Sequence, residues 1–144
     1  MRVAIVDGQG GGIGKLIVEK VRWRFGERVD ILALGTNALA TAAMLKAGAN
    51  EGASGENAIV INAPHVDVIM GSLSIVVPNA QLGELTPKMA EALAGSWARK
   101  ILLPLNRSNI ELVGVTGEPL PHLVDEMVSR LEQLYKDSRD NQYN

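Results

Sequence analysis

The strongest constraint on the fold is a cluster of glycines directly after the first apolar segment. Residues 2–6 are mainly apolar and β-branched, which is typical of a strand buried on both faces of a parallel sheet. Five glycines follow within the seven residues from Gly8 to Gly14, and apolar residues then recur at helical spacing from Ile13 to Val21. The segment therefore predicts a strand, a glycine-rich loop and a helix.

A glycine loop of this kind has a chemical consequence. Without Cβ atoms, backbone N–H groups can converge on an anion, and the start of the following helix adds partial positive charge. We therefore expect an anionic ligand here, either a nucleotide such as NAD or NADP or another small phosphorylated metabolite. The candidate binding residues are Gly8, Gln9, Gly10, Gly11, Gly12, Ile13, Gly14 and Lys15. In the competing interpretation the glycines only permit close packing of strand and helix.

The rest of the chain alternates between strand and helix patterns. Further strands are predicted over residues 30–34, 66–70, 100–105 and 111–115. Helices are predicted from Asn37 to Ala47, from Thr86 toward Arg99, and through 123–135, before a frayed tail from Asp137. Residues 53–62 fit a strand or a helix, and Ser54 as a cap with Pro64 beyond favours the helix. Residues 74–77 fit either a strand or a helical turn.

This alternation predicts the α/β class. We expect one domain over residues 1–144, a Rossmann-like three-layer α/β/α fold with a mainly parallel sheet of about five strands. Right-handed crossovers then place every strand-to-helix loop at the carboxyl edge of the sheet, where ligands bind. The polar residues expected to complete a pocket there are Thr36, Asn37, Glu56, Asn57 and Asn106. Helix capping by Glu56 and Asn57 and an Asx-turn at Asn106 are the alternatives.

Acidic residues near the loop leave several roles open. Dinucleotide sites usually place an acid at the end of the second strand to hold the ribose hydroxyls, but this chain has Gly35-Thr36-Asn37 there. Asp7, at the end of the first strand, can bind a metal, accept a proton or accept hydrogen bonds from the loop N–H groups. We favour the last role, because a free carboxylate would repel a phosphate.

Composition excludes several classes of protein. There is no cysteine, which removes disulfides and thiolate metal sites, and His65 and His122 show no metal-ligand spacing, so no metal is expected. A net charge of −2 and 3% aromatic residues argue against nucleic-acid binding. Neither a signal peptide nor a membrane span is recognisable, so we expect a cytoplasmic protein without membrane contact. No catalytic constellation stands out, and enzymatic activity stays open.

Several segments together resemble a small bacterial family that is known only as a domain of unknown function. They are residues 7–15, 34–38, 55–58, 83–92 and 100–106. The resemblance covers nearly the whole chain and implies a Rossmann-like fold, but it brings no established activity. The spacing of Gly8, Gly12 and Gly14 is also similar to short-chain dehydrogenases, whose Tyr-x-x-x-Lys pair is missing here.

A different class of function is a non-enzymatic interaction or scaffold protein with a purely structural glycine loop. Residues 68–77 are more apolar than the edge of one small domain requires, which favours a homo-oligomer. The sequence therefore predicts a small-ligand module, with a self-associating scaffold as the alternative.

Overall fold

The computed structural model describes residues 1–143 and contains a five-stranded sheet in the order β3-β2-β1-β4-β5. Every neighbouring pair of strands is parallel. The strands are β1 (Arg2–Asp7), β2 (Asp30–Gly35), β3 (Glu51–Ser54), β4 (Val68–Ser72) and β5 (Arg99–Leu103). The predicted α/β class and Rossmann-like layering are confirmed.

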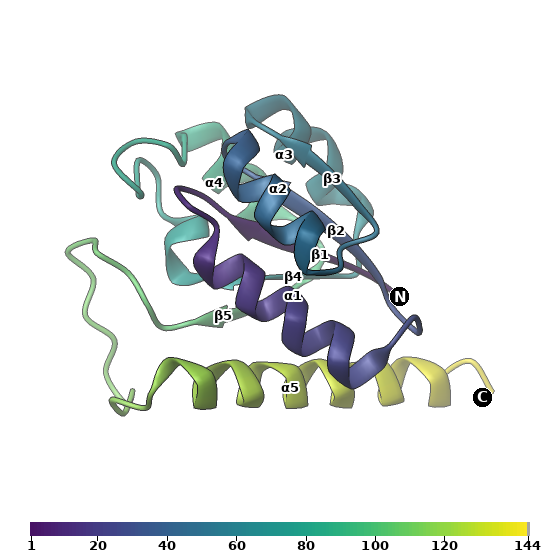
Figure 1. The fold of residues 1–144 in the computed structure, drawn as a ribbon. Coiled ribbons are helices and arrows are strands. Elements are labelled where there is room, and N and C mark those ends of the chain that lie inside the picture. The colour runs from purple at the N-terminus through teal and green to yellow at the C-terminus, as the bar shows by residue number, and fades with distance from the viewer. Residues whose placement is uncertain (144) are drawn as a thin grey trace.

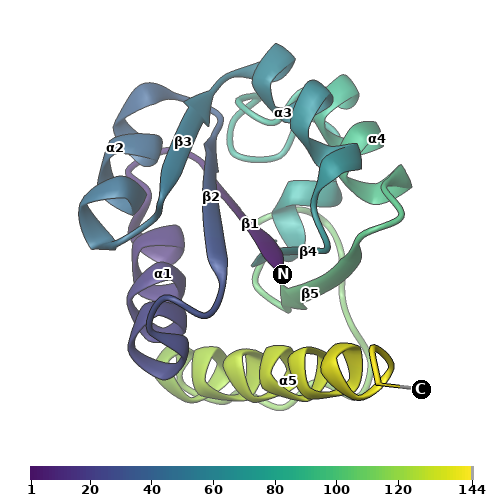
Figure 2. The same ribbon diagram turned by 90° about the vertical axis from the view of Figure 1, so that its right-hand side faces the viewer.

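Five α-helices cover the two faces of the sheet. They are α1 (Gly12–Phe25), α2 (Ala38–Ala47), α3 (Glu56–Asn62), α4 (Pro87–Gly95) and α5 (Leu120–Asp140), with short 3₁₀ turns η1 (Ala63–His65) and η2 (Leu73–Val76). Figure 2 shows the sheet between α1, α2 and α5 on one side and α3 and α4 on the other. None of the described helices is long and apolar enough to cross a membrane.

Alternate residues of the central strand β1 build two separate cores. Val3 and Ile5 pack with α1 and α5, whereas Ala4 and Val6 pack with α3, η2 and α4. All four side chains are almost fully buried. Because both faces are covered, the strand is continuously apolar rather than alternating.

Local signals account for several helix boundaries. The Asn37 side chain accepts a hydrogen bond from the Ala40 amide and begins α2, and Thr86 does the same for Met89 at the start of α4. Gly11, at φ 76°, precedes α1, a backbone conformation that favours glycine. The predicted apolar stripe of the last helix is confirmed, and this helix continues past Asp137 to Asp140.

The structure corrects the prediction in several places. Residues 111–115 form no strand: Gly114 lies at φ 86°, which breaks an extended chain, and Val113 is fully exposed. The fifth strand is instead β3, which directly precedes α3, so the ambiguous segment 53–62 contains the end of a strand and then a helix.

Further along the chain, one helix is shorter than predicted and an undecided segment is settled. The helix predicted toward Arg99 ends at Gly95, since the backbone is already extended at Ser96, with φ −63° and ψ 146°. As its proline predicts, β5 ends before Pro104, which has no N–H to donate. The undecided residues 74–77 lie mostly in the 3₁₀ turn η2. Finally, the apolar run 68–77 supplies buried core rather than an exposed patch, since β4 is buried along its whole length.

Candidate functional site

The loops that could bind a ligand meet where the chain order of the strands reverses. From β1 the chain builds β2 and β3 on one side and returns to β4 and β5 on the other, so the switch point lies between β1 and β4. The loops after β1, β4 and β5 gather at this carboxyl edge, on the left of Figure 1. They line a cavity of about 750 Å³. Its lining residues are Asp7, Gly8, Gln9, Ile13, Ser72, Ser74, Asn79, Ala80, Gln81, Leu82, Pro104, Leu105, Asn106, Arg107 and Ser108.

Inside the glycine loop, the carboxylate of Asp7 takes part of the place expected for a ligand anion. The Gly8 amide donates to Asp7 Oδ1 at 2.8 Å and the Gly14 amide donates to Oδ2 at 2.6 Å. The favoured role of Asp7, as an acceptor for loop N–H groups, is thereby confirmed. The amides of Gly11 and Lys15 are also paired, with the carbonyl oxygens of Gly8 and Gly11. Among residues 1–143, the amides of Gly10 and Gly12 have no acceptor.

Asp7 is the buried acid of the site, with 7% of its surface exposed. Burial raises the pKa of its carboxyl group above the ordinary value of 3.8, and the hydrogen bonds from Gly14 and Gly8 only partly oppose this rise. The nearby charge of Glu84 raises the pKa further. A buried carboxylate with a perturbed pKa beside a cavity is typical of functional sites, although structural roles produce it too.

A compact surface loop, residues 77–85, covers the glycine loop and is called the lid here. Backbone hydrogen bonds from Asn79 to Leu85 and from Leu85 to Ala80 close it on itself, and Ala80 and Leu85 anchor it in the core. At its tip Leu82 is 96% exposed. Asn79, Gln81 and Leu82 all have φ between 59° and 66°, so the lid holds three non-glycine residues in the left-handed region.

Two lid side chains reach the glycine loop. A Cβ atom on Gly8 would fall on the side-chain oxygen of Gln81 and would lie 2.5 Å from Thr36 Oγ1. A side chain at position 8 would therefore displace the end of the Gln81 side chain and the Thr36 hydroxyl. Gln81 Oε1 is buried there and has no hydrogen-bond partner within residues 1–143.

Glu84 places the second carboxylate at this loop. Its Oε1 atom accepts from the Gln9 amide at 2.9 Å, from Thr36 Oγ1 at 2.8 Å and from Asn37 Nδ2 at 2.7 Å. The Gln9 amide contributes most to lowering the pKa of Glu84 below its ordinary value of 4.5, and Thr36 and Asn37 add to it. The carboxylate is thus held in its ionised form at the end of β2.

The structure brings together only some of the predicted site residues. Gly8, Gln9, Ile13 and Asn106 line the cavity, and Thr36 and Asn37 join Gln9 through Glu84. Asn106 accepts a hydrogen bond from the Ser108 amide at 3.1 Å, which is the Asx-turn considered as its alternative role.

The remaining predicted residues do not line this cavity. Gly10, Gly12 and Lys15 lie exposed at the start of α1, and Gly11 and Gly14 pack against Ala40 and Met44 of α2. Glu56 and Asn57 form the first turn of α3, but neither they nor the predicted cap Ser54 caps it, because the cap position is Gly55 and no side chain bonds there. Gln81, Glu84 and Arg107 were not among the predicted residues. Gln81 and Glu84 lie in the turn before Thr86-Pro87. This pair predicts the start of a helix, and so the end of the lid, but it gives no signal of what the lid covers.

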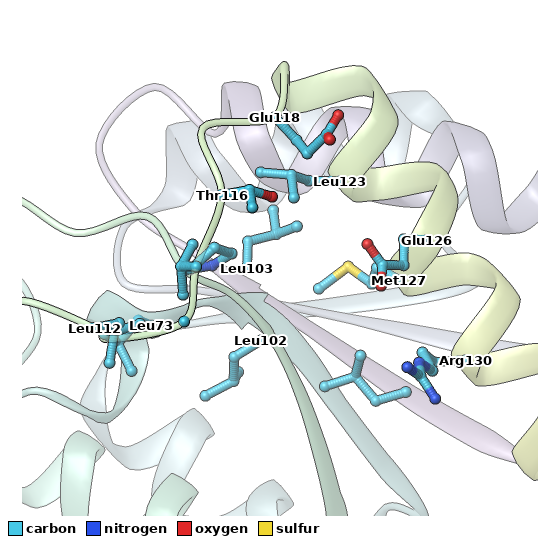
Figure 3. Close-up of a pocket in the computed structure, with 14 residues that line it drawn as sticks. Leu73, Leu102, Leu103, Leu112, Thr116, Glu118, Leu123, Glu126, Met127 and Arg130 are labelled. Atoms are coloured by element: carbon cyan, nitrogen blue, oxygen red, sulfur yellow. The ribbon is translucent and has the colours of Figure 1, made fainter.

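A second cavity, of about 480 Å³, lies between β5, α5 and the connection that joins them. In Figure 3 the apolar side chains of Leu103, Leu123 and Met127 gather around it, with Glu126 and Arg130 of α5 at its border. Its lining is mainly aliphatic and it is remote in sequence from the glycine loop. Among residues 1–143, no three histidine, aspartate or glutamate side chains are grouped to hold a metal ion.

The parallel sheet, its strand order and the cavity at the switch point define an α/β protein of the Rossmann-like class. The family described as domain of unknown function DUF3842 matches residues 2–136, and the chain belongs to this family. No curated protein matches the chain, and neither does any solved structure.

Proposed function

We propose that this protein binds a small phosphorylated ligand, with nucleotides foremost, in the cavity at the switch point. The observation that carries the proposal is the position of the cavity, since ligands of open α/β sheets bind outside the carboxyl ends of the strands where the strand order reverses. Its volume of about 750 Å³ suits a metabolite of nucleotide size.

The distribution of charge decides where the phosphate lies. Asp7 and Glu84 both act on the glycine loop, so a phosphate on the amides of Gly8 or Gly14 would meet a carboxylate already bonded there. Of the described residues that line the cavity, Arg107 alone carries positive charge, and Asn106 and Ser108 flank it. The proposed phosphate position is therefore the turn 106–108, on the side away from the two acids.

Two features of the glycine loop support a longer ligand of the NAD type. The exposed amides of Gly10 and Gly12 have no acceptor within residues 1–143, and they lie at the amino end of α1. Backbone N–H groups at a helix start favour negative charge. In this proposal they receive the second phosphate of a dinucleotide, whereas a mononucleotide occupies the cavity alone.

The test is a thermal-shift panel of NAD, NADP, ATP, ADP, AMP and sugar phosphates, followed by calorimetry with the best ligand. Arg107→Gln should weaken binding about tenfold or more, because a charge-assisted phosphate contact is lost. Arg99→Gln is the matched control: it removes the same charge at the start of β5, on the opposite edge of the sheet. Failure of every ligand to stabilise the protein, or equal losses in both variants, would contradict the proposal.

The alternative, self-association, is favoured by one specific observation. The apolar segment 110–115 is exposed, and Val113 has no cover at all. Static light scattering at micromolar concentration should then give a dimer mass that Val113→Asp lowers to the monomer mass. A monomer mass for the unsubstituted protein would remove this alternative.

A further inference from the structure

The lid presents two acceptor oxygens that no group in the described chain satisfies. Gln81 Oε1 is buried without a hydrogen-bond partner. Glu84 Oε2 receives no hydrogen bond from residues 1–143, whereas Oε1 of the same carboxylate receives three. Native proteins pair nearly all buried polar atoms, so an orphaned oxygen beside a ligand cavity calls for a partner that the chain itself does not supply.

The two acceptors belong to one small area above Gly8. The position of a Cβ on Gly8 would touch the Gln81 oxygen and Thr36 Oγ1 together, and Thr36 in turn donates to Glu84. Gln81, Gly8 and Gln9 also line the cavity. A ligand in the cavity therefore meets the lid at Gln81, and Glu84, which does not itself line the cavity, is joined to its border through the Gln9 amide.

The hydrogen bonds around Glu84 suit it to accept further hydrogen bonds from hydroxyl groups rather than to pair with a cation. All three of its donors are neutral, so none cancels its charge, and all three bind the same oxygen. This arrangement fixes the carboxylate and leaves Oε2 as a strong acceptor. These donors favour the ionised form of Glu84, and only this form has both lone pairs of Oε2 free to accept hydrogen bonds from hydroxyl groups.

The location of the Glu84 carboxylate also agrees with recognition of hydroxyl groups. A dinucleotide site holds its ribose with an acid at the end of the second strand, and this chain carries Thr36 and Asn37 there. Both residues bind Glu84, so the lid brings a carboxylate from the connection between η2 and α4 to the position where the strand itself lacks one.

We infer that Gln81 and Glu84 of the lid are specificity-determining residues that accept hydrogen bonds from neighbouring hydroxyl groups of the ligand, so that the site selects a phosphorylated sugar or ribonucleotide with a vicinal diol. The inference rests on the proposed function, because it assigns the sugar end of the ligand whose phosphate lies at Arg107. With the phosphate at the turn 106–108 and the hydroxyls at the lid, the ligand spans the cavity from the loop after β5 to the loop after β1.

The experiment compares AMP, 2′-deoxy-AMP and 2′,3′-dideoxy-AMP as probes by calorimetry on the unsubstituted protein. AMP should bind about tenfold or more tightly than 2′,3′-dideoxy-AMP, with the 2′-deoxy compound between them, because hydrogen bonds to a carboxylate are lost stepwise. This comparison requires no variant, so it cannot be confused with a failure to fold.

Two variants then assign the discrimination to the lid. Glu84→Gln keeps an oxygen for Gln9, Thr36 and Asn37 but removes the charge, and Gln81→Leu removes the orphaned acceptor. Each should reduce the ratio of AMP to dideoxy-AMP affinity toward one while leaving dideoxy-AMP affinity within about twofold. Glu91→Gln, an exposed acid on α4, is the matched control and should keep the full ratio.

The possible results separate the two proposals. If AMP and dideoxy-AMP bind the unsubstituted protein equally well, the inference is overturned and the proposed function stands. If no probe of the nucleotide and sugar-phosphate panel binds, both are overturned. If the ratio is large but neither Glu84→Gln nor Gln81→Leu reduces it, the hydroxyl groups are read by other residues and the lid assignment is overturned.

Discussion

Two carboxylates accept hydrogen bonds from the same glycine loop, and they differ in burial and in their hydrogen-bond partners. Asp7 stands at the end of the central strand, almost fully buried, and pairs with the amides of Gly8 and Gly14. Glu84 stands on the lid, partly open to solvent, and pairs with the Gln9 amide and two side chains at the end of β2. One acid belongs to the sheet and the other to a surface loop.

The difference separates a structural role from the proposed binding role. Burial raises the pKa of Asp7, so its ionised form is disfavoured, and the hydrogen bonds from the closed loop offset this cost only in part. Hydrogen bonds without deep burial lower the pKa of Glu84, so its charge is favoured where it stands. A buried acid can therefore hold part of a glycine loop from inside while a second, more accessible acid is left for the proposed ligand.

The largest effect on stability is expected from Asp7→Ala. The variant leaves the amides of Gly8 and Gly14 without their acceptor at the start of α1, and we expect a loss of about 3 kcal/mol in the free energy of unfolding. Urea denaturation measures it. Asp30→Ala, which removes a partly exposed ion pair with Arg2 at 3.4 Å, should cost about 0.5 kcal/mol or less. Equal costs would show that Asp7 does not hold the loop.

A smaller loss is expected from Gly8→Ala, which tests the contact between lid and loop. The new Cβ would collide with the end of the Gln81 side chain and with Thr36 Oγ1, so both side chains must shift and their contacts with the lid loosen, at a cost of about 1–2 kcal/mol. Backbone amides of residues 79–85 should exchange with deuterium faster, while those within β1 keep their protection. In the control Gly10→Ala, nothing lies within 4 Å of the added atom, and exchange in the lid should not change.

Glu84→Ala should cost still less stability, about 1 kcal/mol, because the three donors it frees can reach water. Its effect should be local: faster deuterium exchange in residues 79–85, with unchanged exchange in α1. Asp7→Ala should instead raise exchange at the start of α1. If both variants loosened the same segment, the division between an acid of the sheet and an acid of the lid would be wrong.

Sequence alone identified β1, the glycine loop and α1, because apolar periodicity and glycine content are local signals. It missed β3, a four-residue edge strand that contains Glu51 and Gly52 and has no apolar run. It predicted a strand at 111–115 because an apolar pattern does not show whether a neighbouring strand is available for pairing. Within the site, Glu84 meets Thr36 across 48 residues of sequence, a contact that no spacing rule predicts.

The smallest expected effects are those of pH, and here the two acids should act in opposite directions. NMR titration of the side-chain carboxyl groups should give a pKa above 3.8 for Asp7 and below 4.5 for Glu84. The reverse order would contradict the assignment of burial to one acid and donor bonding to the other.

Stability should follow the same signs. Because the folded pKa of Glu84 is lowered, its contribution is complete above about pH 4.5 and is lost as the pH falls through the folded value. Because the folded pKa of Asp7 is raised, the folded protein holds that proton longer than the unfolded chain does, so its contribution is largest below pH 3.8 and declines as the pH rises through the folded value. The difference in unfolding free energy between the unsubstituted protein and Glu84→Gln should therefore grow between pH 3 and 5, by a few tenths of a kcal/mol because solvent screens this acid. A difference that shrank over this range would mean that the lid holds Glu84 in its protonated form, which could not accept hydrogen bonds in the way its three donors require.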